Sequence, residues 1–158
     1  MVFFFEGRPS DSPLVEGIWR TRSEGGGSFT SSAASNFEMV VTKQKGITTL
    51  TLRGPETMAS PAPIPEDAEF FGITFKLGTF MPHMSASSLV NGSTNLPEIT
   101  NQSFWLMGAA WQFPTFDNAD TFVRRLVRER LLVRDEVVGA ILQEQPQPQP
   151  PAWSERTL

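Results

Sequence analysis

The chain has 158 residues, and its 13 Lys and Arg against 17 Asp and Glu give a formal net charge of −4 at pH 7. This acidic balance argues against a polybasic surface for nucleic acid. The absence of cysteine and the single histidine exclude disulfides, thiolate metal sites and imidazole-rich metal sites. A chain of this length can bury one core without such staples, so we expect one compact domain with a tail, and no metal or cofactor.

The first residues do not predict export or membrane insertion. The apolar residues 2–5 are followed at once by Glu6, with no basic segment before them, which is not the pattern of a signal peptide. No stretch approaches the roughly 20 apolar residues that span a bilayer. We therefore expect no membrane partner, and the lack of cysteine agrees with a cytoplasmic location.

Several segments show the two-residue alternation or the β-branched content of strands. They are residues 14–22, 36–43, 47–53 and 70–78, with a short apolar strand at 104–107. Gly46 lies between the second and third segments and predicts a hairpin there. Three prolines in 58–67 predict an extended connection without regular structure. Residues 81–98 are predicted to be a long loop, and 111–116 an aromatic connection.

After residue 116 the apolar period changes from two residues to 3.6. Asp117 and Asn118 supply an N-cap, and the apolar face of Phe122, Leu126 and Leu131 predicts a helix that extends to residue 132. A second short helix is predicted to start at Asp135. Residues 145–151 form a Pro/Gln segment with polyproline II character. Strands followed by helices predict a mainly β protein with C-terminal helices, built as a small barrel or sandwich.

Candidate catalytic groups are sparse. His83 has no second imidazole and no carboxylate at ligand spacing, so we expect it to be structural, and no serine lies in a nucleophile elbow. Glu66, Asp67 and Glu69 are interpreted as a solvated acidic cluster. Glycines 25–27 lack the lysine of a phosphate loop. We therefore expect no catalytic residues, and a protein that is not an enzyme.

Aromatic residues are the more informative group, because 13 Phe and 4 Trp occur with no Tyr. Such side chains fill a core or line a pocket for a small apolar or aromatic ligand. The candidates for a ligand pocket are Trp19, Phe37, Phe75, His83, Trp105 and Trp111.

The last five residues, Ser-Glu-Arg-Thr-Leu, resemble the Ser-x-Arg-Thr-Leu opening of the recognition helix in the AraC/XylS family of bacterial transcription regulators. Residues 133–142 look like the helix that precedes it, with the Pro/Gln segment as a lengthened turn. Residues 12–132 are similar in pattern to the amino-terminal sensor domains of such regulators. The motifs that carry this similarity are the Trp19 strand, the 71–78 strand, Leu96 with Pro97, and the helix cap at 116–120.

The resemblance implies a cupin-like β-barrel in residues 1–116, and a helical segment in 117–144 for dimerisation and the start of the helix-turn-helix region. A linker at 145–153 and a truncated recognition helix at 154–158 would follow. It implies an effector-sensing or dimerising domain of a homodimer that reads DNA only as a full-length protein. The dimer-surface candidates are Phe122, Arg125 and Leu126, and the DNA-binding remnant is Ser154, Arg156 and Thr157. The several histidines of a cupin metal site are missing, so metal-dependent chemistry is not expected.

Two alternatives stay open on the sequence. One is a small metal-free cupin-like enzyme of the isomerase or epimerase type that uses His83 with a carboxylate. The other is an orphan barrel that binds a small molecule and has no regulatory partner.

Overall fold

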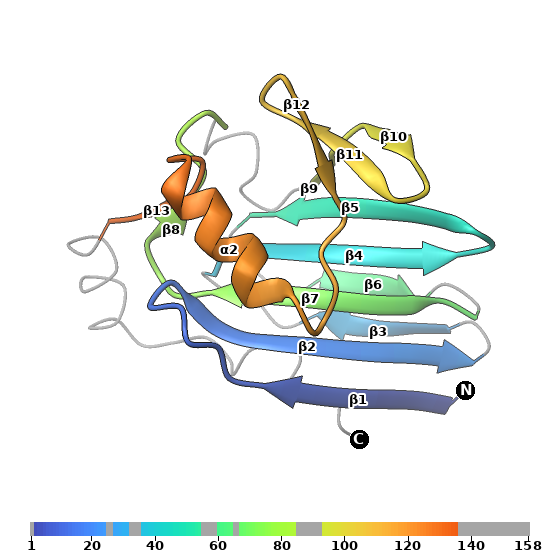
Figure 1. Ribbon diagram of the computed structural model, residues 1–158. Coiled ribbons are helices and arrows are strands. Elements are labelled where there is room, and N and C mark those ends of the chain that lie inside the picture. Colours follow the sequence, from blue (N-terminus) through green and yellow to red (C-terminus); the bar gives the residue numbers. More distant parts are fainter. Residues whose placement is uncertain are drawn as a thin grey trace.

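A six-stranded antiparallel sheet forms the centre of the computed structural model, which describes residues 2–24, 27–31, 36–54, 60–64, 67–84 and 93–135 (Figure 1). Its strands lie in the order β1-β2-β7-β4-β5-β9. Their bounds are Val2–Arg8 for β1, Val15–Glu24 for β2, Glu69–Phe75 for β7, Glu38–Gln44 for β4, Ile47–Arg53 for β5 and Ser93–Asn95 for β9. The sheet is open, with β1 and β9 at its edges.

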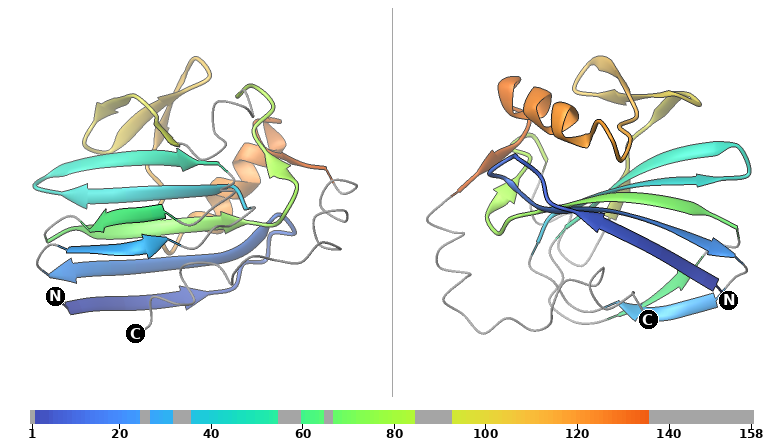
Figure 2. Two further views of the ribbon diagram at one scale, coloured as in Figure 1. Left: turned by 180° about the vertical axis from the view of Figure 1, so that it is seen from behind. Right: turned by 60° about the horizontal axis from the view of Figure 1, so that its bottom comes forward.

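Three smaller sheets surround it. They are β10-β11-β12 (Glu98–Thr100, Ser103–Leu106, Ala109–Gln112), the pair β3 and β6 (Gly27–Ser31, Ser60–Ile64), and the pair β8 and β13 (Thr79–Phe80, Val133–Arg134). In the described residues the only helix is α2, Ala119–Arg128, which lies across one face of the large sheet (Figure 1). The β3–β6 ribbon lies on the opposite side (Figure 2).

The hairpin of β4 and β5 follows from its turn residues. Gln44 pairs with Ile47, so Lys45 and Gly46 form a two-residue turn, and their φ angles are 53° and 77°. Two positive φ angles match the right-handed twist of the flanking strands, and glycine adopts such an angle without steric cost. The predicted hairpin at Gly46 is therefore confirmed.

The core lies between the large sheet and α2. Alternate residues of the central strands point to this face, among them Ile18, Met39 and Ile73, each with at most 2% of its surface exposed. From α2, Phe122, Val123 and Leu126 pack against them, and Phe104, Leu106 and Trp111 of the β10–β12 sheet complete the cluster. Burying such side chains is worth roughly 1.5–3 kcal/mol each.

The opposite face of the sheet carries a polar chain of contacts around Trp19. The indole stacks on the Phe5 ring and donates from Nε1 to Thr74 Oγ1 at 3.2 Å. Thr74 Oγ1 donates in turn to Glu38 Oε2 at 2.8 Å. The indole lies flat over Gly72, where an added Cβ would be 2.1 Å from Trp19 Cζ2. A glycine is therefore required beneath this tryptophan.

Sequence periodicity located most of the regular elements. The strands predicted at 14–22, 36–43, 47–53, 70–78 and 104–107 are confirmed as β2, β4, β5, β7 and β11, and the mainly β class is confirmed. The helix begins as predicted but ends at Arg128, because Arg130 has a φ of 61° and the Leu131 N–H returns to the Leu126 carbonyl. The predicted second helix after Asp135 lies outside the described residues.

Other expectations were wrong. The 58–67 segment contains β6, the predicted 81–98 loop contains β9, and the connection placed at 111–116 begins within β12. Strand β1 was not expected at all. Asn118 occupies the N-cap position, yet its Oδ1 accepts from the Thr115 N–H and does not cap the helix. Among the described residues, no helix has the length and apolar character needed to cross a bilayer.

Candidate functional site

A cavity of about 480 Å³ opens on the core face of the large sheet, beside the N-terminal end of α2. Ligand pockets commonly measure roughly 300–1,000 Å³, so this volume suits a small molecule. The connection from β12 to α2 crosses in front of the central strands at this point (Figure 1). The lining residues are Phe5, Glu6, Arg20, Thr21, Arg22, Val41, Lys43, Glu69, Phe70, Phe71 and the four residues 114–117, here named the roof loop.

The floor of the cavity is apolar. Val41 and Phe71 are cross-strand partners on β4 and β7, and they are 2% and 9% exposed. They continue the core face formed by Met39 and Ile73 two residues away on the same strands. Helix α2 lies over the other end of this face, and the roof loop crosses the strands here (Figure 1).

Phe116 fixes the roof loop to the sheet. The Arg20 guanidinium lies 4.3 Å from the centre of the Phe116 ring, and the Arg8 guanidinium lies 5.2 Å from it. A cation over an aromatic face is worth about 0.5–1 kcal/mol at exposed sites. Arg20 is held in place by Glu6, with Nη2 and Oε2 at 2.7 Å. The roof loop is therefore attached to the sheet through the contact of Phe116 with Arg20, whose charge is paired with Glu6.

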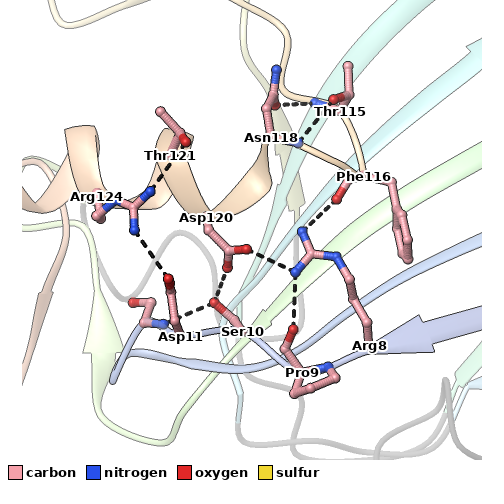
Figure 3. A network of polar contacts seen from close by, with 11 residues as sticks. Arg8, Pro9, Ser10, Asp11, Thr115, Phe116, Asn118, Asp120, Thr121 and Arg124 are labelled. Carbon is pink, nitrogen blue, oxygen red and sulfur yellow. Dashed lines mark hydrogen bonds and ion pairs between the residues drawn. The ribbon is translucent and has the colours of Figure 1, made fainter.

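Arg8 joins the roof loop to α2 (Figure 3). Its Nη2 donates to the Phe116 carbonyl at 2.6 Å, and its Nη1 donates to Asp120 Oδ2 at 2.9 Å. Ser10 Oγ donates to the other carboxylate oxygen of Asp120. Asp120 lies in the first turn of α2, where a negative charge is favoured by the helix dipole. One half-buried ion pair thus connects β1, the roof loop and the helix.

These contacts alter the pKa of Asp120. Burial alone raises this pKa, but hydrogen bonds from Ser10 and Arg8, together with the positive charges of Arg8 and Arg124, outweigh burial. The net pKa of Asp120 is below the usual aspartate value, and the carboxylate is ionised near neutral pH.

The charged rim of the cavity contains three groups that make no ion pair with a described residue. Lys43 on β4 and Glu69 on β7 are cross-strand partners, so both side chains leave the same face of the sheet. Neither side chain makes a hydrogen bond or ion pair with a described residue. Asp117 of the roof loop also has no ion pair in the described part of the chain. The rim therefore offers an ammonium group and carboxylates that make no ion pair with the part of the chain that the structure describes.

None of the residues predicted for a ligand pocket lines this cavity. Trp19, Phe37, Phe75 and Trp111 are buried packing residues, at most 4% exposed. Trp105 is 47% exposed on the outer side of the β10–β12 sheet. The structure brings some of these rings together in pairs, with 5.6 Å between the ring centres of Phe37 and Phe75, but it does not gather the six residues around one space.

His83 lies in the turn that follows β8. Both ring nitrogens are shielded from solvent and have no hydrogen-bond partner in the described structure. Burial lowers the pKa of His83, because the charged imidazole loses hydration. No described carboxylate contacts this ring, so the acid–base pair of an epimerase is not formed by the described residues.

The predicted dimer-surface residues divide between two environments. Phe122 and Leu126 are 8% and 0% exposed and pack in the core of their own chain. Arg125 is on the outer face, stacked 3.7 Å from the centre of the Trp111 ring and paired with Glu129. Val127, at 38% exposed, is the apolar residue that the outer face of α2 presents. The DNA-binding remnant, Ser154, Arg156 and Thr157, lies outside the described residues.

Two general observations complete the site. Within the described ranges, no group of three His, Cys, Asp or Glu residues is placed to hold a metal ion. No family model matches the sequence, and neither a curated protein nor a solved structure matches it. The cavity and its connection to α2 are therefore the basis for a functional proposal.

The strand pattern contained a signal that could have identified the rim. Lys43 and Glu69 occupy core-face positions near the ends of β4 and β7, whose other core-face residues are apolar, and on β2 the core-face position of Ile18 is followed by those of Arg20 and Arg22. A charge in such a position indicates where a sheet face leaves the core and meets solvent. The sequence did not show that these three strands are neighbours.

Proposed function

We propose that the chain is the effector-sensing and dimerisation part of a bacterial AraC-like transcription regulator, with a cupin-like strand arrangement. The observation that supports the proposal is the continuity of the cavity with α2: the roof loop runs directly into the helix, and Arg8 binds both. A ligand that contacts the roof loop favours one position of this loop, and thereby one placement of the helix. The sequence resemblance of residues 154–158 supplies the regulatory context.

In this proposal the protein is cytoplasmic, is not an enzyme and needs no cofactor. The cavity accepts a small effector with an apolar body, which rests on Val41 and Phe71. The outer face of α2, with Val127 among arginines, contacts a second copy of the chain. DNA reading belongs to the full-length regulator, and a mobility-shift assay at low salt is expected to show no sequence-specific binding by residues 1–158.

Native mass spectrometry of the purified chain tests the proposal. We expect a dimer, and in the sensing state a defined non-covalent mass that an added effector displaces. A monomer at high concentration, with and without candidate effectors, would contradict the dimerisation part.

Sedimentation velocity of a Val127→Arg variant tests the dimer surface. A further positive charge buried among the arginines of this face is costly, so this variant is expected to shift the chain to monomer. Ile99→Arg is the matched control, because Ile99 is similarly exposed, at 48%, but lies on β10. Equal behaviour of the two variants would remove α2 from the interface.

A further inference from the structure

We infer that the cavity under the roof loop binds a zwitterionic α-amino acid with an apolar or aromatic side chain. The inference rests on the proposed role of the cavity as the effector site, and it specifies the class of effector. Its starting point is the juxtaposition of Lys43 and Glu69 at the same register position of neighbouring strands.

The charge spacing on the sheet matches the ligand class. Neighbouring strands lie about 4.8 Å apart, and directly opposed residues point to the same side. Lys43 and Glu69 therefore present opposite charges side by side, with Arg22 of β2 on the other side of Glu69, and neither Lys43 nor Glu69 makes an ion pair with a described residue. An α-amino acid carries its ammonium and carboxylate on a single carbon, so it can place each next to the opposite charge of the protein.

The same pair disfavours ligands with one charge. A simple carboxylate that approaches Lys43 also approaches Glu69, and a simple amine that approaches Glu69 also approaches Lys43. In either case the like charge opposes binding. Asp117 of the roof loop adds a second carboxylate to the lining.

The apolar part of the ligand is accommodated by the remaining lining. Val41 and Phe71 form the floor, and Phe116 forms part of the roof. An aliphatic or aromatic side chain placed between them removes apolar surface from water on both sides. Of the three lining cations, Arg20 is engaged by Glu6 and Phe116, and Arg22 has an interaction of its own, so Lys43 is the cation that makes no ion pair with a described residue.

Amide chemical-shift titration of the whole chain tests the inference with three probes of matched size. They are L-phenylalanine, 3-phenylpropanoate, which lacks the ammonium, and phenethylamine, which lacks the carboxylate. We expect L-phenylalanine to shift amide signals of residues 41–43, 69–71 and 115–117. We expect the two single-charge analogues to bind about tenfold more weakly, since each loses one ion pair and meets one like charge.

Charge-neutral variants locate the binding groups. Lys43→Gln and Glu69→Gln are each expected to weaken L-phenylalanine binding about fivefold, the upper range for an exposed ion pair. Lys45→Gln and Glu98→Gln are the controls, because these exposed residues do not line the cavity, and they are expected to leave binding unchanged. Glu69→Gln is also expected to raise the affinity for 3-phenylpropanoate relative to that for L-phenylalanine, because it removes the carboxylate that repels this ligand.

The outcomes separate this inference from the proposed function. Equal or tighter binding of a single-charge analogue would overturn the amino-acid class while leaving the cavity as an effector site. No shift at the cavity with any of the three probes would also overturn the class. Binding of L-phenylalanine at the cavity without any change at α2 or in the dimer would support the ligand class and contradict the regulatory function.

Discussion

Trp19 and Gly72 show how one small residue determines the position of a large one. The indole is 2% exposed, donates to Thr74 and occupies the space that any side chain at position 72 would need. Trp19 was a candidate for a pocket wall, but a tryptophan in a strand that mixes apolar and charged residues is equally typical of a packed residue. A pocket wall and a packed tryptophan are distinguished by the residue opposite on the neighbouring strand, here Gly72. The sequence around Trp19 does not tell which residue that is.

Gly72→Ala is expected to destabilise the protein by about 1–3 kcal/mol, because the new methyl group forces the indole away from Thr74. Urea denaturation measures the change. Gly7→Ala is the control, since its Cβ would meet Phe5 Cε1 at an ordinary contact of 3.5 Å, and a change within about 0.5 kcal/mol is expected. Equal effects of the two substitutions would mean that the packing over Gly72 adapts freely.

His83 is expected to make stability depend on pH. Its pKa is lowered in the folded protein, so the unfolded chain binds the proton more tightly. Stability therefore falls as the pH drops below the ordinary value of 6.5 and continues to fall until the lowered pKa is passed. Denaturation of the wild type and a His83→Leu variant at about pH 8 and about pH 5.5 measures this. The variant should lose less stability on acidification, and an equal loss would exclude His83 as the cause.

At the scale of elements, the connection between β1, the roof loop and α2 depends on Asp120. Asp120→Asn is expected to cost about 1–2 kcal/mol, because Arg8 and Ser10 lose a charged acceptor in a half-exposed site. The exposed pair of Asp11 with Arg124 is the control, and Asp11→Asn should change stability by less than about 0.5 kcal/mol.

The contribution of Asp120 also depends on pH, but for a different reason. Burial lowers the pKa of His83, whereas hydrogen bonds and positive charges lower the pKa of Asp120 against the effect of burial. The pKa of Asp120 is lowered in the folded protein, so its contribution is complete above the ordinary value of 3.8 and is lost as the pH falls through the lowered pKa. Urea denaturation of wild type and Asp120→Asn across this range should show the two stabilities converging in acid. A constant difference between them would contradict the role of the ionised carboxylate.

Elements with a regular period were predictable, and elements that lack one were not. Alternation in β4 and β7 and the 3.6-residue period of α2 are local properties of the chain. Strand β6 was missed because of Pro61 and Pro63, yet two prolines at alternate positions place their missing N–H groups on one side of the strand and leave the other side free to pair with β3. Strand β1 was missed because residues 2–5 are apolar without alternation.

At the scale of the whole molecule, the candidate site could not be predicted because it depends on strand order. Arg20, Lys43 and Glu69 belong to three segments that are separated in the sequence and become neighbours only in the order β2-β7-β4. The roof loop is a fourth segment, distant from these three in the sequence, that lines the same cavity. The class of fold was evident from the succession of strands and helix, whereas the open sheet and its cavity required the structure.

The central position of β7 has a consequence for the time course of folding. β4 and β5 are joined by a two-residue turn and pair early, whereas β7 must insert between β4 and β2, and its Thr74 meets Trp19 across 55 positions of the sequence. Closing such a long loop is entropically unfavourable, so folding in roughly milliseconds to seconds is expected.

Gly46→Ala tests this order of events, because an added Cβ there contacts nothing and the cost of about 1 kcal/mol arises from the positive φ alone. In stopped-flow experiments we expect slower folding with little change in unfolding, as for a hairpin already formed in the transition state. Faster unfolding with unchanged folding would place the hairpin late. If the hairpin forms first, the insertion of β7 between β2 and β4 is the step that commits the chain to the native sheet. Before that step, the edges of β2 and β4 that later pair with β7 are unpaired and can associate with other chains.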